Sequence, residues 1–492
     1  MELKKLLNGL ETTKKYEGQN FDISDISFDS RKVYSDGENG IFVCLKGENT
    51  DGHLFASDAL NNGAKVIVTE TPLNLTKNEI VVKSTRQALA VLSSNFYENA
   101  HKKLKLIAIT GTNGKTTTTF MLKSILEASG KKVGLIGTTG AYIGKQFLSV
   151  NLTTPDPMDL HRLFKQMVDN ACEYCIMEAS AHSLFLDKLF GLKFEASIFS
   201  NFTQDHLDFF KTMDNYKQAK LKLFTKEYSK CCIVNVDDNV GMEILNGCDI
   251  ACVGYALYSP ADCFAIDIFK SYTGSKFVLN LLDDIFDAEI NLPGEFNIYN
   301  ALAAASTARI LGVSATNIKL GLKNLKFVSG RFNSVKLING AYAIIDFAHT
   351  PDGLLKVLSA IKELNPKKLI TVFGCGGNRD KDKRHKMGEI SDNCSDFSII
   401  TSDNPRFENP ELILKDIEKG FKSDRYVTIV DRAKAVEIAL SLSRKGDIVA
   451  ILGKGGENYQ DINGVKVPYS DYDNVVKFNE KMETIISVMG VE

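Results

Sequence analysis

The chain has 492 residues, enough for roughly three domains of ordinary size, and 44% of them are hydrophobic. Its formal net charge is −2, so no basic surface argues for a nucleic acid or an anionic membrane as a partner. No apolar run is long enough for a signal peptide or a membrane span. The ten cysteines are scattered as reduced thiols are, and Cys172-x-x-Cys175 has no second pair at zinc-like spacing. We therefore expect a cytoplasmic monomer that binds neither nucleic acid nor membrane.

Residues 1–102 alternate short β-like runs with helical patterns. The β-like runs are Gly40–Leu45, Ala64–Thr69 and Ile80–Val82, and the helical patterns are Phe55–Asn62 and Gln87–Tyr97. This alternation predicts a small N-terminal α/β domain, with residues 100–103 as the linker to the next domain.

A glycine-rich loop opens the second predicted domain, residues 103–330. The apolar run Leu106–Ile109 leads into Gly111-Thr-Asn-Gly114-Lys115-Thr116, and an apolar, Thr-rich segment at helical spacing follows. A strand, a glycine-rich turn and a helix start in this order cradle phosphates with backbone N–H groups. This is the short form of the loop, since Ile109 stands where the eight-residue pattern has glycine. We expect Lys115 to reach the β- and γ-phosphates of a nucleoside triphosphate and Thr116 to ligate Mg²⁺; the alternative is a glycine turn with a solvated lysine.

Alternating strands and helices continue through this domain and predict a mostly parallel sheet. The predicted strands are Lys132–Ile136, Tyr174–Glu178, Ala196–Ser200 and Cys231–Asn235, and residues 262–292 indicate an antiparallel edge or flap before an Ala-rich helix, Asn300–Leu311. Glu178, at a strand end, could meet the Mg²⁺ of the nucleotide, because hard cations take oxygen ligands. The alternative for Glu178 is a helix N-terminal charge. His206 lies after another strand, and Lys220 lies in a helical segment where local reasoning assigns it no function.

The third predicted domain, residues 331–492, again alternates predicted strands with predicted helices. Its predicted strands are Ala343–Asp346, Leu369–Phe373, Phe397–Thr401, Tyr426–Val430 and Asp447–Leu452, and its predicted helices are Leu354–Leu364, one near Lys386–Asn393, Glu411–Phe421 and Ala433–Ser443. Polar clusters follow four of the strands: residues 346–349, 374–380, 403–406 and 453–457. Ligands of open α/β sheets bind outside the carboxyl ends of the strands, so these clusters predict a binding site.

The motifs GTNGKTTT, EASAH, NFTQDHLDF, GEFNIYNALAA, GRF, DFAHTPD, GCGGNRDKDKR and DNPR occur in this order along nearly the whole chain. In this set and order the chain resembles the Mur ligases. The resemblance implies three α/β domains: an N-terminal domain, a central P-loop ATPase-like domain with a mostly parallel sheet, and a Rossmann-like C-terminal domain. It also implies ATP-dependent amide formation through an acyl phosphate, which an amine then attacks.

The resemblance implies roles for residues in the central domain and at its border with the third domain. Expected ATP contacts are Gly111, Thr112, Asn113, Gly114, Lys115, Thr116, Thr117, Asn297, Arg331, Asp346 and His349. Expected catalytic residues are Lys115, Lys220, Glu178 and His206. Expected Mg²⁺ ligands are Thr116, Glu178, His206 and Lys220, with Lys220 carbamylated by CO₂. Carbamylation turns a cation that would repel a metal into an anion that can ligate it.

The resemblance also implies a UDP-N-acetylmuramoyl dipeptide as substrate. Expected contacts to it are Ser30, Thr153, Thr154, Ser180 and Lys188. Two positions depart from the family: Lys188 stands where arginine is common, and Ala181 where a second serine is common. Lysine keeps the charge at this position but loses the bidentate fork of arginine.

The DNPR motif resembles the version of the family that takes meso-diaminopimelate as the acceptor amine. Expected acceptor contacts are Arg379, Asp403, Asn404, Pro405, Arg406, Gly453 and Glu457. Diaminopimelate has a second carboxylate that lysine lacks, and arginines are apt bidentate partners for carboxylates. One position departs from many relatives, since Gly456 stands where they have histidine.

Three alternatives stay open. The chain could be a Mur ligase with L-lysine or another amine as acceptor, a folylpolyglutamate-type relative, or a P-loop ATPase or nucleotide switch that ligates nothing. Thr153-Thr154-Pro155 and the separate N-terminal domain with Asp29-Ser30-Arg31 favour a muramoyl substrate over folate. A nucleotide switch would leave the strand-end clusters of the third domain without a role.

Overall fold

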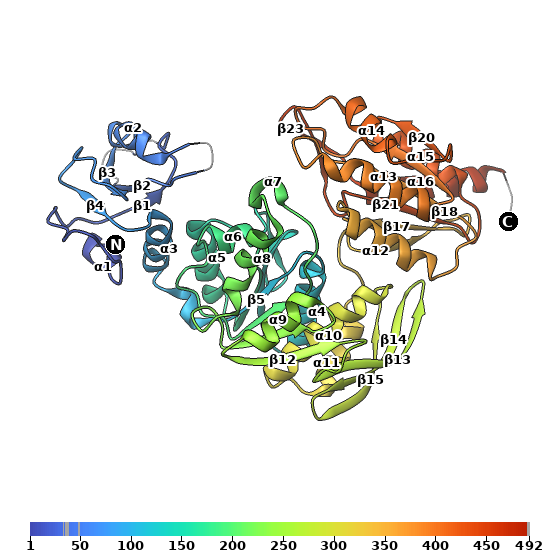
Figure 1. Ribbon diagram of the computed structural model, residues 1–492, viewed down its shortest axis with the longest axis horizontal. Helices are drawn as coiled ribbons and strands as arrows, with labels where there is room; N and C mark the ends of the chain where they lie inside the picture. Colours follow the sequence, from blue (N-terminus) through green and yellow to red (C-terminus); the bar gives the residue numbers. More distant parts are fainter. Residues whose placement is uncertain (33, 35–38, 48–49, 490–492) are drawn as a thin grey trace.

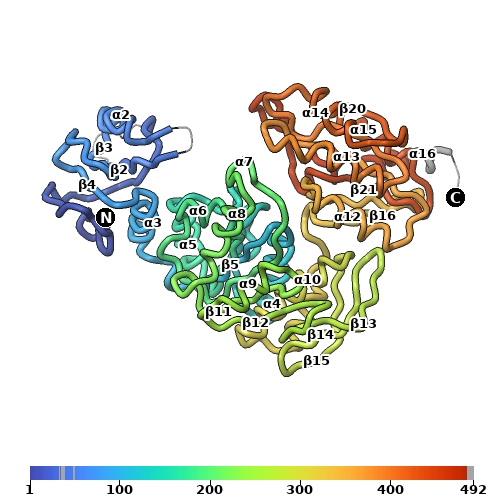
Figure 2. Tube along the Cα trace, in the orientation of Figure 1, coloured from blue at the N-terminus to red at the C-terminus, as the bar shows by residue number. Residues whose placement is uncertain are grey.

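The computed structural model describes residues 1–32, 34, 39–47 and 50–489. It contains three α/β bodies in chain order, with the N-terminal and C-terminal bodies on either side of the central one (Figure 1). The tube in Figure 2 shows the same order without returns of the chain from one body to another. No helix among the described residues is long and apolar enough to cross a bilayer.

The N-terminal body is built on a four-stranded parallel sheet in the order β1-β2-β3-β4. The strands are β1 (Asp25–Ser27), β2 (Gly40–Val43), β3 (Ala64–Thr69) and β4 (Glu79–Val81), and the helices are α1 (Leu3–Leu6), α2 (Ala56–Asn61) and α3 (Thr85–Phe96). Ser84 caps α3 by accepting a hydrogen bond from the Gln87 N–H, as small hydroxyl residues do at helix starts. The predicted strands and helices of this part are present, with ends that differ by a few residues.

The central body contains an eleven-stranded sheet in the order β15-β14-β13-β12-β11-β10-β5-β9-β6-β7-β8. Its strands are β5 (Lys105–Thr110), β6 (Val133–Gly137), β7 (Gly140–Ile143), β8 (Gln146–Leu148), β9 (Tyr174–Glu178), β10 (Ala196–Phe199), β11 (Cys231–Asn235), β12 (Ala251–Ala256), β13 (Cys263–Ser271), β14 (Gly274–Leu281) and β15 (Asp284–Ile290). Its helices are α4 (Lys115–Ala128), α5 (Pro157–Asp169), α6 (Ala181–Phe185), α7 (Leu207–Phe210), α8 (Met213–Leu221), α9 (Asn239–Gly247), α10 (Glu295–Ile310) and α11 (Ala315–Asn324).

Strand β5 lies inside this sheet, between β10 and β9 and parallel to both. Its side chains alternate between the two faces, as the period of a strand requires. Ile107 and Ile109 belong to the core that includes residues of α4 and α10, whereas Leu106 and Ala108 belong to the core that includes residues of α5. The apolar run before the glycine-rich loop is thus buried on both faces, which fixes where the loop emerges.

The predicted antiparallel flap at residues 262–292 is confirmed as β13, β14 and β15, which pair antiparallel with one another and extend the central sheet beyond β12. The predicted helix Asn300–Leu311 begins earlier, at Glu295. Cys172 and Cys175 are buried free thiols.

The C-terminal body contains a six-stranded sheet in the order β16-β17-β21-β18-β19-β20, in which only the pairing of β16 with β17 is antiparallel. Its strands are β16 (Asn333–Lys336), β17 (Tyr342–Asp346), β18 (Leu369–Phe373), β19 (Phe397–Thr401), β20 (Tyr426–Ile429) and β21 (Ile448–Leu452), followed by the hairpin of β22 (Tyr459–Ile462) and β23 (Val465–Pro468). Its helices are α12 (Pro351–Lys362), α13 (Asp382–Cys394), α14 (Pro410–Glu418), α15 (Arg432–Leu442) and α16 (Asp471–Met489). The five predicted strands are confirmed to within one residue at each end.

The segment predicted as a linker is a turn whose first two residues, Ala100 and His101, are buried and whose last two are exposed. Residues Ala100–Lys103 form a 3-10 helix, and the His101 ring packs edge-to-face on His161 of α5 with 5.2 Å between ring centroids. Burial lowers the pKa of His101 to about 4 and that of His161 to about 3. Among the residues that the structure describes, His161 Nδ1 has no hydrogen-bond partner, so a proton on this atom would be both buried and uncompensated.

This histidine pair predicts a loss of stability in mild acid. A histidine whose folded-state pKa lies below its unfolded value binds more protons when unfolded, so stability falls as the pH drops below about 6.5. For His161 the loss at pH 5 relative to pH 8 is about 2 kcal/mol. We expect His161→Gln to lose about that much less stability than the wild type between these pH values, as measured by urea unfolding. The exposed His385→Gln variant is the control, and equal acid sensitivity of the wild type and His161→Gln would contradict the assignment.

Candidate active site

The glycine-rich loop occupies residues 111–114, between the end of β5 and the start of α4. Gly111 and Gly114 have φ angles of +143° and +87°, a region that side chains other than glycine rarely adopt. Neighbours also leave no room: an added Cβ would lie 1.9 Å from Ser200 Oγ at Gly111 and 2.4 Å from Asn300 Oδ1 at Gly114. Both glycines are therefore required for backbone conformation and for close packing, as in a phosphate-binding loop.

Lys115 folds back over this loop. Its ammonium donates hydrogen bonds to the carbonyl oxygens of Gly111 and Thr112, both at 3.0 Å. Burial lowers its pKa, and the charges of Glu178 and Asp205 oppose that shift. The ammonium is therefore held at the loop, where it can exchange its hydrogen bonds to carbonyl oxygens for hydrogen bonds to phosphate oxygens.

Thr116 lies at the centre of a buried polar cluster. Its hydroxyl donates to Glu178 Oε1 at 2.8 Å and accepts from Arg331 Nη2 at 3.1 Å. Thr138 donates to the same carboxylate through its N–H, at 3.0 Å from Oε1, and through its hydroxyl, at 2.9 Å from Oε2. Glu178 is completely buried, and both of its carboxylate oxygens accept hydrogen bonds within this cluster.

The oxygens of Thr116 and Glu178 fit Mg²⁺, which binds to one or two carboxylates and completes its shell with phosphate oxygens and water. Across the parts of the chain that the structure describes, no group of three or more His, Cys, Asp or Glu side chains is arranged to hold a metal.

Lys220 and His206 form a second group beside the loop. The buried Lys220 ammonium donates to the Gly111 carbonyl oxygen at 2.9 Å, the same oxygen that Lys115 contacts. Burial, reinforced by the charge of Lys115, places the Lys220 pKa well below its usual value, although Asp205 opposes the shift. His206 has a left-handed backbone with φ of +54°, and its ring packs edge-to-face on His182 at 4.8 Å.

The Thr116–Glu178 group and the Lys220–His206 group therefore lie on the same loop but are not arranged as one set of metal ligands. Lys115 and Lys220 both donate to the Gly111 carbonyl oxygen of that loop. The structure thus brings the four residues expected to be catalytic to a single loop, with Lys220 directed at backbone rather than at Glu178.

The remaining nucleotide candidates line the loop or link to it. Thr112 donates to the Thr203 carbonyl, and the buried Thr117 lies in the first turn of α4. Asn297 is buried in α10, where its side chain donates to the Pro293 carbonyl at 2.7 Å and accepts from Asn300 at 3.0 Å. Asn297 thus lies one hydrogen bond from Asn300, which contacts the loop at Gly114.

Residues of the C-terminal body approach the same loop. The guanidinium of Arg331 lies over the Phe347 ring, 4.6 Å from its centroid. Asp346 is buried and accepts from the N–H groups of Phe332 and Ala348, both at 2.7 Å, and burial raises its pKa even though Arg331 opposes this. His349 Nδ1 lies 2.8 Å from the Phe347 carbonyl oxygen, and burial lowers the His349 pKa. Asp346 therefore fixes the backbone at Phe332 and Ala348, and the contact of His349 through Nδ1 leaves its Nε2 atom to bind another partner.

Asp352, the last residue of the DFAHTPD motif and one to which the sequence assigned no role, joins the two bodies. Its Oδ2 atom accepts from Asn113 Nδ2 at 2.8 Å and from Thr203 Oγ1 at 3.1 Å, and it pairs with Lys356 at 3.0 Å. Asp352 lies in the first turn of α12, after Thr350 and Pro351 at the helix start. A sequence search could have noted an acidic first turn but not its contact across the domain boundary.

We expect Asp352→Ala to weaken nucleotide binding through looser domain contact. The carboxylate is partly exposed, so losing its hydrogen bonds should cost about 1 kcal/mol, or roughly a fivefold rise in the KM for ATP. Small-angle scattering should show a larger radius of gyration than for the wild type. The exposed Asp424→Ala variant of the same domain is the control, and an unchanged KM and radius would contradict this role.

Three of the five muramoyl-contact candidates, Thr153, Thr154 and Ser180, lie beside Glu178. Thr154 Oγ1 donates to the Glu178 carbonyl oxygen at 2.8 Å and accepts from the Ser180 N–H at 3.1 Å, and the Thr153 hydroxyl lies 3.1 Å from that of Thr138. Lys188 pairs with Asp156 at 2.7 Å. Ser30, the fifth, lies in the N-terminal body, where its carbonyl accepts from Asn62 at 2.8 Å.

The guanidinium of Arg406 and the aliphatic stem of Arg379 both lie near Gly376, in the loop after β18. An added Cβ at Gly376 would lie 2.9 Å from Arg406 Nη1 and 3.8 Å from Arg379 Cγ. Arg406 has a left-handed backbone with φ of +52°, and its Nη1 donates to the Gly377 carbonyl at 2.8 Å. Its Nε lies 3.8 Å from Asp461, a distance that leaves the guanidinium only weakly paired. Arg379 is exposed.

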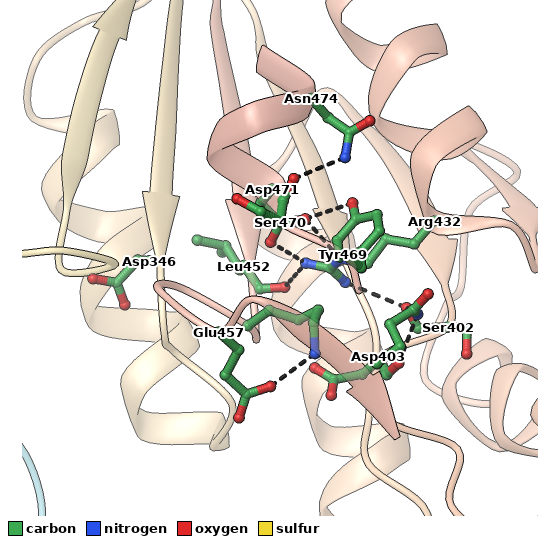
Figure 3. A network of polar contacts seen from close by, with 12 residues as sticks. Asp346, Ser402, Asp403, Arg432, Leu452, Glu457, Tyr469, Ser470, Asp471 and Asn474 are labelled. Carbon is green, nitrogen blue, oxygen red and sulfur yellow. Dashed lines mark hydrogen bonds and ion pairs between the residues drawn. The ribbon is translucent and has the colours of Figure 1, made fainter. Parts of the chain in front are cut away.

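The other acceptor candidates follow β19 and β21, which lie on either side of β18 in the sheet. Asp403 is buried, and Gly453 must be glycine because an added Cβ would lie 2.7 Å from Asp403 Oδ2. Asn404 Nδ2 donates to Glu457 Oε2 at 2.9 Å. The Pro405 carbonyl accepts from the Glu408 N–H at 3.0 Å. Figure 3 shows Asp403 and Glu457 in this network.

A buried ion pair lies next to the end of β21, where one of the acceptor loops begins. Arg432 and Asp471 are both fully buried, with Arg432 Nη2 at 2.8 Å from Asp471 Oδ2 and Nε at 2.9 Å from Oδ1 (Figure 3). The same Nη2 donates to the carbonyl of Leu452, the last residue of β21, at 3.0 Å. A cavity of about 490 Å³ is lined by Arg406, Phe407 and Arg432, but not by Asp403, Asn404 or Glu457.

Together these features define a P-loop enzyme in which a second α/β domain presents paired charges beside the nucleotide loop. Three family models match the chain: the Mur ligase middle domain at residues 109–308, the Mur ligase glutamate ligase domain at 330–455, and the Mur ligase family catalytic domain at 22–100. The UDP-N-acetylmuramoyl-L-alanyl-D-glutamate–2,6-diaminopimelate ligase 1 of Clostridium acetobutylicum is 43% identical over 486 residues, covering 98% of this chain and 100% of that protein. The chain therefore belongs to the Mur ligase family, and it is a ligase.

Further relatives agree. The corresponding ligase of Clostridium perfringens is 43% identical over 484 residues, covering 96% of this chain and 99% of that protein. A solved structure of a UDP-N-acetylmuramoyl-L-alanyl-D-glutamate–2,6-diaminopimelate ligase is similar with a TM-score of 0.71 and 30% identity, covering 98% of this chain and 99% of that one. A MurF ligase from Thermotoga maritima, solved with ADP, shares the fold at a TM-score of 0.61 and 20% identity, covering 93% and 97%.

Proposed function

We propose that this chain joins meso-diaminopimelate to UDP-N-acetylmuramoyl-L-alanyl-D-glutamate at the expense of ATP, in the synthesis of the peptidoglycan precursor. The observation that carries the proposal is the pair of arginines near Gly376 beside the buried Asp403 and the Glu457 loop. Such a pocket offers cations for the far carboxylate of diaminopimelate and anions for its ammonium. The identity to diaminopimelate ligases over nearly the whole chain supports the same acceptor.

We further propose a division of labour among the domains. Residues 1–102 bind the uridine end of the muramoyl substrate, residues 103–330 bind ATP, and residues 331–492 bind the acceptor. Ser30 would contact the uridine end, whereas Thr153, Thr154, Ser180 and Lys188 would contact the part nearer Glu178. The enzyme would work as a cytoplasmic monomer.

The chemistry would begin with attack of the substrate carboxylate on the γ-phosphate of ATP, which gives an acyl phosphate and ADP. The acceptor amine then attacks the acyl carbon, and phosphate leaves from the tetrahedral intermediate. Lys115 and Arg331, which meet at Thr116 and the loop, would hold phosphate oxygens and offset the charge that develops on them. The protein mainly positions the reactants and neutralises charge.

Mg²⁺, when bound, would supply charge neutralisation at the phosphates, and Thr116, Glu178, His206 and carbamylated Lys220 are the residues that would hold it. The environment of Lys220 supports carbamylation, because its depressed pKa favours the neutral amine, the form that reacts with CO₂. Its place against a backbone carbonyl also means that the side chain must leave Gly111 to reach a metal.

Phosphate release tests the proposal against a non-ligating P-loop ATPase. We expect release to require ATP, UDP-N-acetylmuramoyl-L-alanyl-D-glutamate and the acceptor together, with one amide formed per phosphate. Release from ATP alone, at a rate that neither substrate changes, would support the ATPase interpretation and overturn the ligase proposal.

A further inference from the structure

Lys454 is a lysine with no exposed surface between the loops that follow β19 and β21. Its ammonium donates to Asn404 Oδ1 at 2.9 Å and to Glu457 Oε2 at 2.7 Å. A buried ammonium needs partners of this kind, because an isolated buried charge is costly. Lys454 is therefore the group that joins the two acceptor loops.

The contacts of Lys454 decide how Asn404 is oriented. Lysine can only donate, so the oxygen of the Asn404 amide must face it. That oxygen also accepts from the Asp461 N–H at 2.9 Å, and the amide nitrogen donates to Glu457 Oε2 at 2.9 Å. Glu457 Oε2 thus accepts two hydrogen bonds within the protein, which fixes the carboxylate and directs its other oxygen, Oε1, to other partners.

The same contacts set the charge of the pocket. Asp403 and Glu457 are both acidic, and a further carboxylate placed beside them would be repelled. Lys454 offsets the charge of Glu457 at 2.7 Å, which leaves Arg406 and Arg379 free to act on a ligand carboxylate. Without Lys454 the pocket would favour an acceptor with only an ammonium at its far end.

From this geometry we propose that Lys454 is a positioning and specificity-determining residue for the acceptor: it aligns Asn404 and Glu457 and neutralises Glu457, so that the pocket accepts an amino acid with a second carboxylate. This proposal rests on the proposed function, because it concerns the same pocket. Lys454 itself acts through its two neighbours and does not contact the acceptor.

The test uses Lys454→Met, which keeps the length of the side chain and removes its charge. We expect the KM for meso-diaminopimelate to rise at least about tenfold, while the KM values for ATP and for the UDP-muramoyl dipeptide stay within about twofold. L-lysine, assayed as a competitor of diaminopimelate, should lose less affinity than diaminopimelate does. Lys466→Met is the matched control, because Lys466 is exposed and lies over the ring of Tyr459, which Lys454 also approaches.

A second variant keeps the test valid if Lys454→Met folds poorly. The double variant Lys454→Met/Glu457→Gln removes both charges and leaves no unpaired buried carboxylate. Because Lys454 acts through Glu457 and Asn404, the KM for diaminopimelate in the double variant should stay well below the product of the two single-variant effects. KM effects that multiply would overturn the proposal, as would equal increases in all three KM values.

Failure of this inference differs from failure of the proposed function. If the wild type does not ligate diaminopimelate, the proposed function is wrong. If the wild type does so and Lys454→Met has the same KM for diaminopimelate, only the role of Lys454 is wrong.

Discussion

Replacing Lys220 with alanine should lower kcat by about 10²- to 10³-fold, the loss typical of removing one group that stabilises charge in the transition state. The residue is buried against the nucleotide loop, and its ammonium lies 4.6 Å from the centroid of the Tyr216 ring. Its position beside Lys115 would be unfavourable for a permanent cation, and a carbamate would remove that repulsion. Steady-state phosphate release with saturating substrates measures the effect.

Chemical rescue separates a carbamate from a structural role. Acetate or bicarbonate added to Lys220→Ala should restore part of the activity, because a small carboxylate can replace the lost oxygens in the cavity that the substitution leaves. Lys217→Ala is the control, since Lys217 lies on the same helix but pairs with Glu243 near the surface. A fully active Lys220→Ala enzyme would end the carbamate proposal.

Replacing Arg406 with alanine should raise the KM for diaminopimelate while ATP binding persists. A charge-assisted hydrogen bond contributes about 1.5 to 3 kcal/mol, which corresponds to a rise of roughly ten- to 150-fold. Arg406 is suited to this role because, among the described residues, its guanidinium donates a hydrogen bond only to the Gly377 carbonyl and lies 3.8 Å from the Asp461 carboxylate. Acceptor titrations at saturating ATP and muramoyl dipeptide give the KM.

Two further variants define what Arg406 contributes. Arg406→Lys keeps the charge but loses the bidentate fork, so its KM should lie between those of the wild type and Arg406→Ala. Arg425→Ala, in the same domain but bonded to Asp392 and the Ser395 carbonyl, is the control. Unchanged diaminopimelate kinetics in Arg406→Ala would refute the assignment of the pocket.

Sequence patterns predicted the nucleotide loop well because its signals are local. An apolar strand, two glycines and a helix start lie within a dozen residues, and the structure adds the reason for each glycine, a close contact with Ser200 or Asn300. Five of the six strands of the C-terminal sheet were equally clear, because each is a short apolar run and polar clusters follow four of them, whereas β16 was not predicted.

Roles that depend on distant contacts could not be predicted locally. Lys220 has the pattern of a solvated helix charge, and only the packing of α8 against the loop buries it. Lys454 and Asp352 likewise become informative only when Asn404 and Asn113 are brought beside them. In α10 the Ala-rich part was found, but its first turns contain aromatic and β-branched residues, whose lower helix propensity tertiary burial overrides.

One missed element had a local signal. The hairpin of β22 and β23 turns at Asn463-Gly464, both with positive φ angles of +52° and +79°. Asn-Gly between two short alternating runs is a strong hairpin pattern, because both positions of the turn need positive φ. This hairpin matters for the site, since Asp461 on β22 bonds Asn404 and lies near Arg406.

The most direct test of the acceptor assignment is a side-by-side screen of meso-diaminopimelate, L-lysine and L-ornithine with ATP and UDP-N-acetylmuramoyl-L-alanyl-D-glutamate. Two arginines beside an acidic pair predict that meso-diaminopimelate has the highest kcat/KM, by at least about tenfold over the two acceptors that lack the second carboxylate. A higher kcat/KM for L-lysine or L-ornithine would contradict the account of the pocket.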